Sequence, residues 1–275
     1  VTRGFARSLG LPLLVNFYGS DVSQKAFLRR AERGYREIFE RARYLLVEGP
    51  FMRERLLRLG APAEKIRVQR IAIDVADYPF RERSWDGVRP VRFLFVGRMV
   101  EKKGLDTGLR ALAEAGGGFP WRLTVIGDGP LGGGMRALAA SLGLADRVDF
   151  AGSRSLAETR EAIASHDLLL QPSRTASDGD GEGGAPTVIL EAQACGMPVL
   201  STDHDDIPHV TAPGESAWIA PQGDAGALAE MLRRAVSDPR RWAEMGRAGR
   251  ARVEADHDAT HVVAALEDLY AEATR

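Results

Sequence analysis

Two glutamates in the stretch EGGAPTVILEAQACGMPVL, residues 182–200, have the type and spacing of ligand-binding residues. Glu182 precedes a Gly-Gly-Ala-Pro turn, whereas Glu191 lies about one turn into an apolar helix that we expect to begin near Pro186 or Thr187. The helix dipole explains part of the preference for an acid at Glu191. Because its neighbours are apolar, a buried Glu191 also needs a partner. A sugar diol is suitable, since a carboxylate accepts two hydrogen bonds at once.

Cations follow the predicted strand Val91–Gly97, where Arg98 comes next and Lys103 precedes the following helix. Glycine at the strand end lets a ligand approach the backbone, and two cations beside a helix N-terminus suit a diphosphate. An ordinary solvated loop explains the same charges, so both interpretations stay open. Further anion donors are expected from the free backbone N–H groups of Gly183, Gly184 and Ala185.

Other polar positions are less informative. Asp128, in GDGP, is best explained as a helix cap in a tight turn. Gly152 and Ser153, in FAGS, either offer backbone groups to a planar ring or form a plain turn. His257 and His261 have a spacing that can bind zinc on a helix, but no third ligand is apparent, and we predict no metal site.

The composition of the 275-residue chain excludes several classes of protein. Lys and Arg number 37 and Asp and Glu 38, so no overall charge attracts nucleic acid. One cysteine, Cys195, excludes a disulfide framework and fits a reducing compartment. No apolar run reaches the length of a membrane span, and we expect no signal peptide in the sequence. We therefore expect a cytoplasmic protein, with peripheral association at the inner face of the membrane as a further option.

Short apolar strands alternate with amphipathic helices almost throughout, which predicts an α/β fold with parallel sheets. A proline-rich, charged segment, 81–90, is read as a linker. We predict a partial N-terminal Rossmann-like domain over 1–80, a complete one over 91–248, and a C-terminal helix over 249–275 that crosses back. Three strands are expected before the linker and six after it. The predicted strands are Leu11–Phe17, Tyr44–Glu48, one from Ile66, Val91–Gly97, Arg122–Gly127, Arg147–Gly152, Asp167–Ser173, Pro198–Thr202 and Ser216–Ala220.

The motifs GRMVEKKG, GDGP, VDFAG, DLLLQPS and EGGAPTVILEAQACGMPVLST follow one another from about Val91 to about Ser237. This ordered set resembles the donor-binding domain of the family 4 retaining glycosyltransferases, also called glycosyl transferases group 1, which have the GT-B fold. The resemblance implies transfer of a hexose-type sugar from a nucleotide-diphosphate donor to a hydroxyl, with retention, in bacterial polysaccharide or glycoconjugate synthesis. It implies no metal and no other cofactor.

By this resemblance, Arg98 and Lys103 would hold the donor diphosphate, Glu191 the ribose hydroxyls and Glu182 the donor sugar. The family usually has seven residues between its paired glutamates, whereas eight separate Glu182 from Glu191, so Asp180 is an alternative to Glu182. The remaining residues of the implied donor site are Gly97, Gly152, Ser153, Gly183, Gly184, Ala185, Pro186 and Thr187.

The N-terminal stretch NFYGSDVS resembles a family motif that usually reads His-Gly-x-Asp. Tyr18 takes the histidine position, and Gly19 and Asp21 are kept, so Tyr18 and Asp21 join the catalytic candidates. Tyrosine donates a hydrogen bond but is a poor base at neutral pH. The resemblance to retaining enzymes of this fold implies that the leaving phosphate itself assists the incoming hydroxyl.

The implied partners are a nucleotide sugar and a carbohydrate or lipid-linked acceptor, without nucleic acid. A partial N-terminal domain would leave an unpaired sheet edge, which predicts slow transfer by this chain alone and self-association through that face. Two alternatives stay open. One is a GT-B phosphorylase or epimerase, and the other is a truncated, non-catalytic module that binds a nucleotide sugar.

Overall fold

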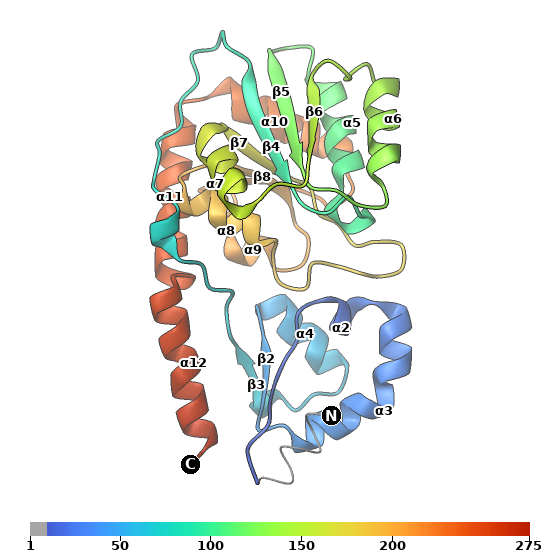
Figure 1. Cartoon of the computed structure of the whole chain (residues 1–275), viewed down its shortest axis with the longest axis vertical. Coiled ribbons are helices and arrows are strands. Elements are labelled where there is room, and N and C mark those ends of the chain that lie inside the picture. Colours follow the sequence, from blue (N-terminus) through green and yellow to red (C-terminus); the bar gives the residue numbers. More distant parts are fainter. Residues whose placement is uncertain (1–9) are drawn as a thin grey trace.

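The computed structural model describes residues 10–275, apart from the side chains of residues 32 and 33, and its strands form two parallel sheets (Figure 1). The N-terminal sheet has the order β1-β2-β3 and the C-terminal sheet the order β6-β5-β4-β7-β8-β9. The strands are β1 (Leu14–Asn16), β2 (Tyr44–Val47), β3 (Ile66–Val68), β4 (Val91–Val96), β5 (Trp121–Ile126), β6 (Val148–Gly152), β7 (Leu168–Gln171), β8 (Val199–Thr202) and β9 (Ala217–Ala220). The predicted class, with a complete C-terminal Rossmann-like sheet, is confirmed.

The strand order of the C-terminal sheet reverses between β4 and β7, which makes their carboxyl ends the expected ligand edge. Helices connect the parallel strands and continue to the C-terminus. They are α5 (Leu105–Ala115), α6 (Gly132–Ser141), α7 (Leu156–Ser165), α8 (Thr187–Ala194), α9 (Ile207–Val210), α10 (Ala225–Ser237), α11 (Arg241–Asp256) and α12 (Ala259–Ala273). Short 3-10 turns are η1 (Ala63–Lys65), η2 (Val75–Asp77) and η3 (Glu101–Lys103).

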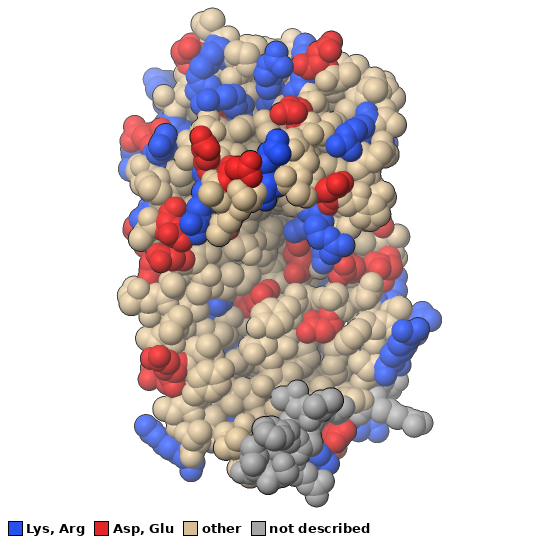
Figure 2. Space-filling view, viewed as in Figure 1, with Lys and Arg blue, Asp and Glu red and all other residues tan. Residues whose placement is uncertain are grey.

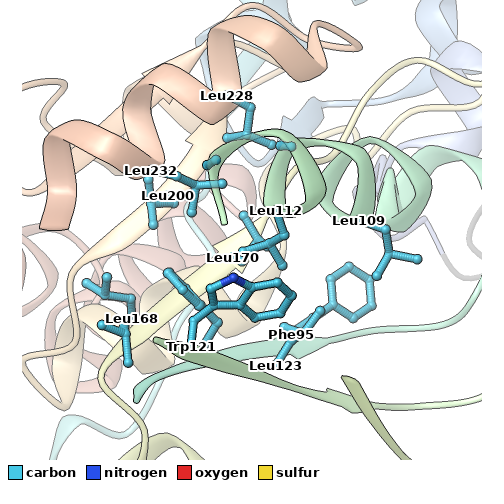
Figure 3. Close-up of a cluster of buried hydrophobic side chains, with 14 of the residues drawn as sticks. Phe95, Leu109, Leu112, Trp121, Leu123, Leu168, Leu170, Leu200, Leu228 and Leu232 are labelled. Carbon is cyan, nitrogen blue, oxygen red and sulfur yellow. The ribbon is translucent and has the colours of Figure 1, made fainter. Parts of the chain in front are cut away.

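The C-terminal sheet is buried on both faces because alternate residues of each strand point to opposite sides. Phe95 and Leu170 belong to one buried cluster, which α5 and α10 cover (Figure 3). Leu94 and Leu169, their neighbours in the chain, belong to a second cluster that α8 covers. Continuous apolar strands in the sequence are therefore explained by helices on both faces.

The N-terminal sheet is covered on one face by α3 (Lys25–Arg41) and α4 (Pro50–Arg58), which Leu45 and Val47 contact. Leu46 points to the other face, where it packs beside α12. Figure 1 shows α12 running alongside this sheet, away from the C-terminal sheet. None of the helices within residues 10–275 is long and apolar enough to cross a bilayer.

One helical expectation is wrong, and one short helix was not predicted. The unpredicted helix is α2 (Ser20–Ser23), which the extended backbone of Gln24 separates from α3. His257 ends α11 and His261 lies in α12, so the two histidines do not share a helix face.

The segment 81–90 has no helix or strand, yet it is held firmly on the C-terminal part. The ring of Trp85 stacks on that of Trp242 with 6.1 Å between centroids. The buried guanidinium of Arg83 donates to the carbonyl groups of Ile163 and His166 at 2.9 Å each. The linker, segment 81–90, is therefore held in a fixed position against the C-terminal part.

Candidate functional site

Lys103 and Glu182 meet at the ligand edge of the C-terminal sheet. Nζ of Lys103 lies 2.8 Å from Oε2 of Glu182, and the hydroxyl of Ser173 donates to Oε1 at 2.7 Å. Only 6% of the Glu182 side chain and 16% of the Lys103 side chain are exposed. A charge-assisted bond this protected fixes both side chains. The structure therefore joins two residues that the sequence places 79 positions apart.

One glycine allows the chain to bring Lys103 to this position. The Lys103 side chain packs over Gly97, directly after β4, where an added Cβ atom would make an ordinary contact at 3.4 Å. Gly104 has a φ of +65°, and a Cβ there would lie 1.8 Å from the carbonyl oxygen of Pro172. Since a side chain fits neither the conformation nor the space at Gly104, glycine is required where η3 passes the end of β7.

Asp180, the alternative to Glu182, faces a different lysine. Its Oδ2 lies 3.1 Å from Nζ of Lys102, which also donates to the carbonyl oxygen of Gly181 at 2.8 Å. The lysine predicted to bind diphosphate therefore pairs with Glu182, despite the extra residue in the loop.

Arg98 lies directly after Gly97 and is exposed. Among the described residues its guanidinium has no hydrogen-bond or ion-pair partner. The Arg98 guanidinium is therefore available to bind an anion near the end of β4. The Lys103 side chain lies over the neighbouring Gly97.

A buried dyad, His204 and Asp205, supports the backbone of the loop that carries Glu182. The Glu182 amide donates to Nε2 of His204 at 3.1 Å, and the Gly183 amide donates to Asp205 at 2.8 Å. Nδ1 of His204 lies 3.1 Å from Oε1 of Gln222, an acceptor, so Nδ1 carries the proton and Nε2 accepts. Asp205 has a φ of 47°, the one positive value outside glycine in residues 10–275. Sequence reasoning placed His204 after a strand, near the loop that carries Glu182, but did not count it among the site residues.

The expectation of free amides in this loop is corrected by these bonds. The Gly183 amide is committed to Asp205, and the carboxylate of Glu48, a residue of the N-terminal part, lies against Gly184. Ala185 is buried, Pro186 is the N-cap of α8, and Thr187 is the exposed first residue of that helix.

Glu191 has a protein partner in the structure. Its Oε1 accepts a 2.9 Å hydrogen bond from the hydroxyl of Tyr78, and the guanidinium of Arg160 lies 5.1 Å from the centre of the Tyr78 ring. Burial raises the pKa of Glu191 above its ordinary value, against the bond from Tyr78. Tyr78, which the sequence analysis missed, therefore supplies one of the contacts that a half-buried carboxylate needs.

Gly152 and Ser153 end β6 at the same edge of the sheet. Gly152 has a φ of 71° and its carbonyl accepts the Gly127 amide at 2.9 Å, while Ser153 is exposed. The structure gives these two residues no contact with Glu182 or Glu191, so their predicted role stays a prediction.

Tyr18, Gly19 and Asp21 face the loop that carries Glu182, which the resemblance predicts to be the donor loop, through a contact between Gly19 and Gly183. Asp21 accepts the amides of Tyr18 and Gly19, the latter at 2.8 Å, and so fixes their turn. A Cβ atom at Gly19 would lie 2.7 Å from the carbonyl oxygen of Glu182, and one at Gly183 would lie 2.2 Å from Cα of Gly19. The Asp21 carboxylate therefore stabilises the turn at Tyr18 and Gly19. Tyr18 itself is 67% exposed.

Glu48, at the end of β2, is a further carboxylate that the sequence analysis missed. Burial raises its pKa to about 7, and the carboxylates of Asp206, Asp21 and Glu182 add to this effect while the Gly184 amide opposes it. The signal was present in YLLVE, since a charged residue that ends a buried parallel strand lies at the ligand edge. Figure 2 shows a recess between the two parts of the molecule, with acidic and basic side chains along its edges.

Comparison with known proteins gives concordant results. The sequence profile of the family described as "Glycosyl transferases group 1" matches residues 83–252. The amylovoran biosynthesis glycosyltransferase AmsK of Erwinia amylovora is 35% identical over 244 residues, which is 87% of this chain and 59% of the relative. The putative colanic acid biosynthesis glycosyltransferase WcaL of Salmonella typhimurium is 33% identical over 236 residues, 84% of this chain and 58% of the relative.

The fold is also that of solved structures. Alr3699/HepE of Anabaena, crystallised with UDP, superposes with a TM-score of 0.84 at 18% identity, over 97% of this chain and 74% of that one. Such a likeness shows the fold, and the predicted GT-B arrangement is confirmed. The chain spans less than two thirds of the length of AmsK and WcaL.

Proposed function

The chain belongs to the glycosyl transferases group 1 family, and on that premise we propose that it moves a sugar from a nucleotide-diphosphate donor to a hydroxyl acceptor with retention of configuration. The proposed process is bacterial polysaccharide synthesis, which the names of AmsK and WcaL support. The proposed location is the cytoplasm, with peripheral contact at the inner membrane face where the acceptor is carried on a lipid.

The observation that carries this proposal is the Lys103–Glu182 pair at the point where the strand order reverses. An ammonium group has three donors, so Lys103 is able to hold Glu182 and a phosphate oxygen together. Arg98 supplies the second cation. Both would stabilise the negative charge that grows on the leaving diphosphate, and Glu182 would accept hydrogen bonds from the sugar beside it.

The nucleoside half of the donor is assigned to Glu191. Tyr78 uses Oε1 of this carboxylate, and Oε2 is left for a ribose hydroxyl. Because Tyr78 fixes the carboxylate before the ligand arrives, less side-chain freedom is lost on binding.

We propose that no divalent metal is needed, because Arg98 and Lys103 supply positive charge at the leaving group. Transfer measured with excess EDTA should equal transfer measured with added Mg²⁺. A strict dependence on Mg²⁺ would contradict this assignment of the two cations.

The decisive experiment has two stages. Calorimetric titration with UDP, GDP and ADP identifies the base, and we expect one of the three to bind more tightly than the others. Release of that diphosphate from its glucose or mannose conjugate is then followed with an acceptor panel, and NMR of the product gives its anomeric configuration. Tight binding without transfer would favour the non-catalytic module, and an inverted product would exclude retention.

A further inference from the structure

The loop that carries Glu182 is flanked by glycines, yet its backbone is fixed. Gly181 precedes Glu182 and Gly183 follows it, and glycine gives a chain its greatest conformational freedom. The amides of residues 182 and 183 nevertheless donate to His204 and Asp205, which follow β8. A Cβ atom at Gly181 would lie 2.5 Å from Oδ2 of Asp205 and 3.3 Å from Cε1 of His204, so the loop lies directly on this dyad.

His204 is fully buried, and its two ring nitrogens have different roles. Nδ1 faces Oε1 of Gln222 at 3.1 Å. The same oxygen accepts the Thr175 amide at 2.8 Å, which fixes the orientation of the Gln222 side-chain amide. Nδ1 therefore carries the proton, and Nε2 is the acceptor for Glu182. Only this tautomer of the neutral imidazole satisfies both of its neighbours.

The dyad needs the loop in its present position. Nε2 of His204 lies 3.2 Å from Oδ2 of Asp205. Because Nε2 has no proton, these two atoms are both acceptors and repel each other unless donors lie against them. The amides of residues 182 and 183 are those donors. Any other position of the loop would leave two buried acceptors unpaired, so the dyad and the loop stabilise each other.

Backbone strain is found at the same place. Asp205 has a φ of 47°, the one positive value outside glycine among residues 10–275. A residue with a side chain keeps a left-handed conformation only where the surrounding structure requires it. Here the carboxylate of this strained residue reaches the Gly183 amide, beside the bond between His204 and Glu182. The strain therefore serves to hold the loop.

The side chain of Glu182 is fixed separately from its main chain. Lys103 and Ser173 hold the carboxylate, whereas His204 holds the peptide amide. A carboxylate that is held at both ends has a single position relative to the strand ends around it. His204 therefore helps to set this position although it is too deeply buried to touch a ligand.

We propose that His204 is a positioning residue for recognition of the donor sugar, because its unprotonated Nε2 holds the Glu182 main chain and so sets the place of the carboxylate. The proposal rests on the proposed function, which assigns the donor sugar to Glu182. It adds that discrimination between sugars depends on a buried side chain that contacts no substrate, with Asp205 as its supporting partner.

The nucleotide half of the donor provides an internal reference. Glu191 lies in α8 and Arg98 directly after β4, and in the described part of the chain neither is hydrogen-bonded to His204 or Asp205. Loss of the bond from Glu182 to His204 should therefore change the affinity for a sugar nucleotide and leave the affinity for the nucleoside diphosphate unchanged.

The test titrates the whole chain by calorimetry, so it does not require transfer. The ligands are UDP, GDP and two pairs of epimeric donors, UDP-glucose with UDP-galactose and GDP-mannose with GDP-glucose. His204→Gln places an amide oxygen near the position of Nε2 and keeps an acceptor for Glu182. His204→Asn reaches only the position of Nδ1, so it keeps the bond to Gln222 and leaves the Glu182 amide unpaired.

We expect the original chain to prefer one epimer of a pair. His204→Gln should keep this preference and bind the preferred sugar nucleotide within about threefold of the original affinity. His204→Asn should lose affinity for that sugar nucleotide on the order of tenfold, and with it the preference, because a buried amide is left without an acceptor. Its affinity for UDP or GDP should stay within about twofold.

His166→Asn is the matched control. Nδ1 of His166 lies 2.7 Å from the Ala162 carbonyl oxygen and Nε2 lies 2.9 Å from the Thr124 hydroxyl, but this ring precedes β7, at the opposite edge of the sheet from Glu182. The variant makes the same chemical change away from the loop and should keep the epimer preference.

Asp205→Gly tests the dyad without adding strain, since glycine adopts a φ of 47° freely. It removes the acceptor of the Gly183 amide and should weaken the preferred sugar nucleotide on the order of tenfold, with the diphosphate unchanged. If His204→Asn does not fold, this variant decides the question, and an unchanged epimer preference in it would contradict the role of the dyad.

Three further results would overturn the inference. They are an unchanged epimer preference in His204→Asn, equal losses in His204→Asn and His204→Gln, and equal weakening of sugar nucleotide and diphosphate, which would show that His204 only supports the fold. An original chain that binds UDP or GDP but does not distinguish the epimers would also overturn it and leave nucleotide binding intact. An original chain that binds no nucleotide would contradict the proposed function, on which the inference rests.

Discussion

At the scale of single residues, the candidate site depends on side chains that already have partners. Lys103 is paired with Glu182, Glu191 with Tyr78, and the backbone of the donor loop with His204 and Asp205. These bonds hold the polar groups in place, so a ligand that uses them meets a preorganised site.

Lys103→Ala should weaken binding of a nucleoside diphosphate far more than binding of the nucleoside, because the lost contact is to phosphate. We expect a cost on the order of 1.5–3 kcal/mol, measured by calorimetric titration of both ligands. Arg110→Ala, on the exposed side of α5, is the control and should change neither titration. Equal losses for the two ligands would show that Lys103 supports the fold and does not bind phosphate.

Glu191→Ala should weaken the nucleoside and the diphosphate alike, because a ribose contact is common to both. The expected loss is again on the order of 1.5–3 kcal/mol for a charged hydrogen-bond acceptor. Glu161→Ala, at an exposed position of α7, serves as the comparison. Unchanged affinity for the preferred nucleotide would remove Glu191 from the donor site.

Glu48 should make stability fall as the pH rises. Its pKa of about 7 in the folded protein lies above the ordinary value of 4.5, so the folded state binds this proton more tightly than the unfolded state does. The contribution is complete below about pH 4.5 and is lost as the pH rises through 7. Because the side chain is partly exposed, we expect about 1–2 kcal/mol.

Urea unfolding at pH 5 and pH 8 measures this effect as a difference between the original chain and Glu48→Gln. The original chain should lose more stability between the two pH values than the variant does, and Glu40→Gln should follow the original chain. A pH dependence identical in all three proteins would show that Glu48 titrates normally.

Sequence reasoning found the residues whose position follows from a strand end. Lys103 and Glu182 were predictable because the carboxyl ends of β4 and β7 are adjacent in a doubly wound sheet. Tyr78 was missed because its partner Glu191 comes from a distant part of the chain, and no local pattern encodes such a contact. Glu48 was missed although its place at the end of a buried strand is a local signal.

At the scale of elements, α4 shows how the two parts depend on each other. Its N-cap is Gly49, which has no side chain, and its first residue is Pro50. The carboxylate of Asp206, from the loop before α9, accepts the amides of Phe51 at 2.8 Å and Met52 at 3.3 Å. A Cβ atom at Gly49 would lie 2.4 Å from this carboxylate, so glycine makes room for a cap supplied by the other part.

Asp206→Ala should therefore destabilise the protein and also loosen the contact between its parts. A lost N-cap costs about 0.5–2 kcal/mol, and urea unfolding should broaden or separate into two transitions. Asp224→Ala is the matched control, because Asp224 caps α10 within the C-terminal part, through Ala227 at 2.9 Å. Asp224→Ala should lower the stability by a similar amount without changing the shape of the urea unfolding transition. If Asp206→Ala and Asp224→Ala unfold with transitions of the same shape, the bridging role of Asp206 is contradicted.

Most elements were predictable to within a few residues because their periodicity is strong. The short helices α2 and α9 were not predicted. The Lys25 amide donates to the carbonyl oxygen of Asp178 at 3.2 Å, a contact between the start of α3 and the loop before α8 that no local pattern in the sequence encodes.

At the scale of the whole molecule, the two parts touch at Gly19 and Gly183. Gly183→Ala should force them apart, because its φ of +83° is strained for alanine and its Cβ would lie 2.2 Å from Gly19. Gly143→Ala has a comparable φ of +71° with nothing within 4 Å, so it reports backbone strain alone. Strain should cost each variant about 1 kcal/mol.

Small-angle X-ray scattering separates the two effects. Only Gly183→Ala should increase the radius of gyration, and it should also lose affinity for the nucleotide diphosphate because the donor loop moves. An unchanged radius for this variant would mean that the loop absorbs the added methyl group and that the contact does not set the distance between the parts.

The chain passes between the two parts twice, and the two passages are bonded to each other. The Ile73 amide donates to the carbonyl oxygen of His257 at 3.0 Å, and the Ala259 amide donates to that of Ile73 at 2.9 Å. Trp85 and Arg83 also hold segment 81–90, which follows the first crossing, against the C-terminal part. Little unattached chain therefore remains there to bend. Any opening motion must therefore rotate the two parts about these two hydrogen-bonded crossing points, at Ile73 and at His257–Ala259. Gly19 and Gly183, on separate parts, would then move apart while Ile73 and His257 stay together, which confines substrate entry to the side that opens.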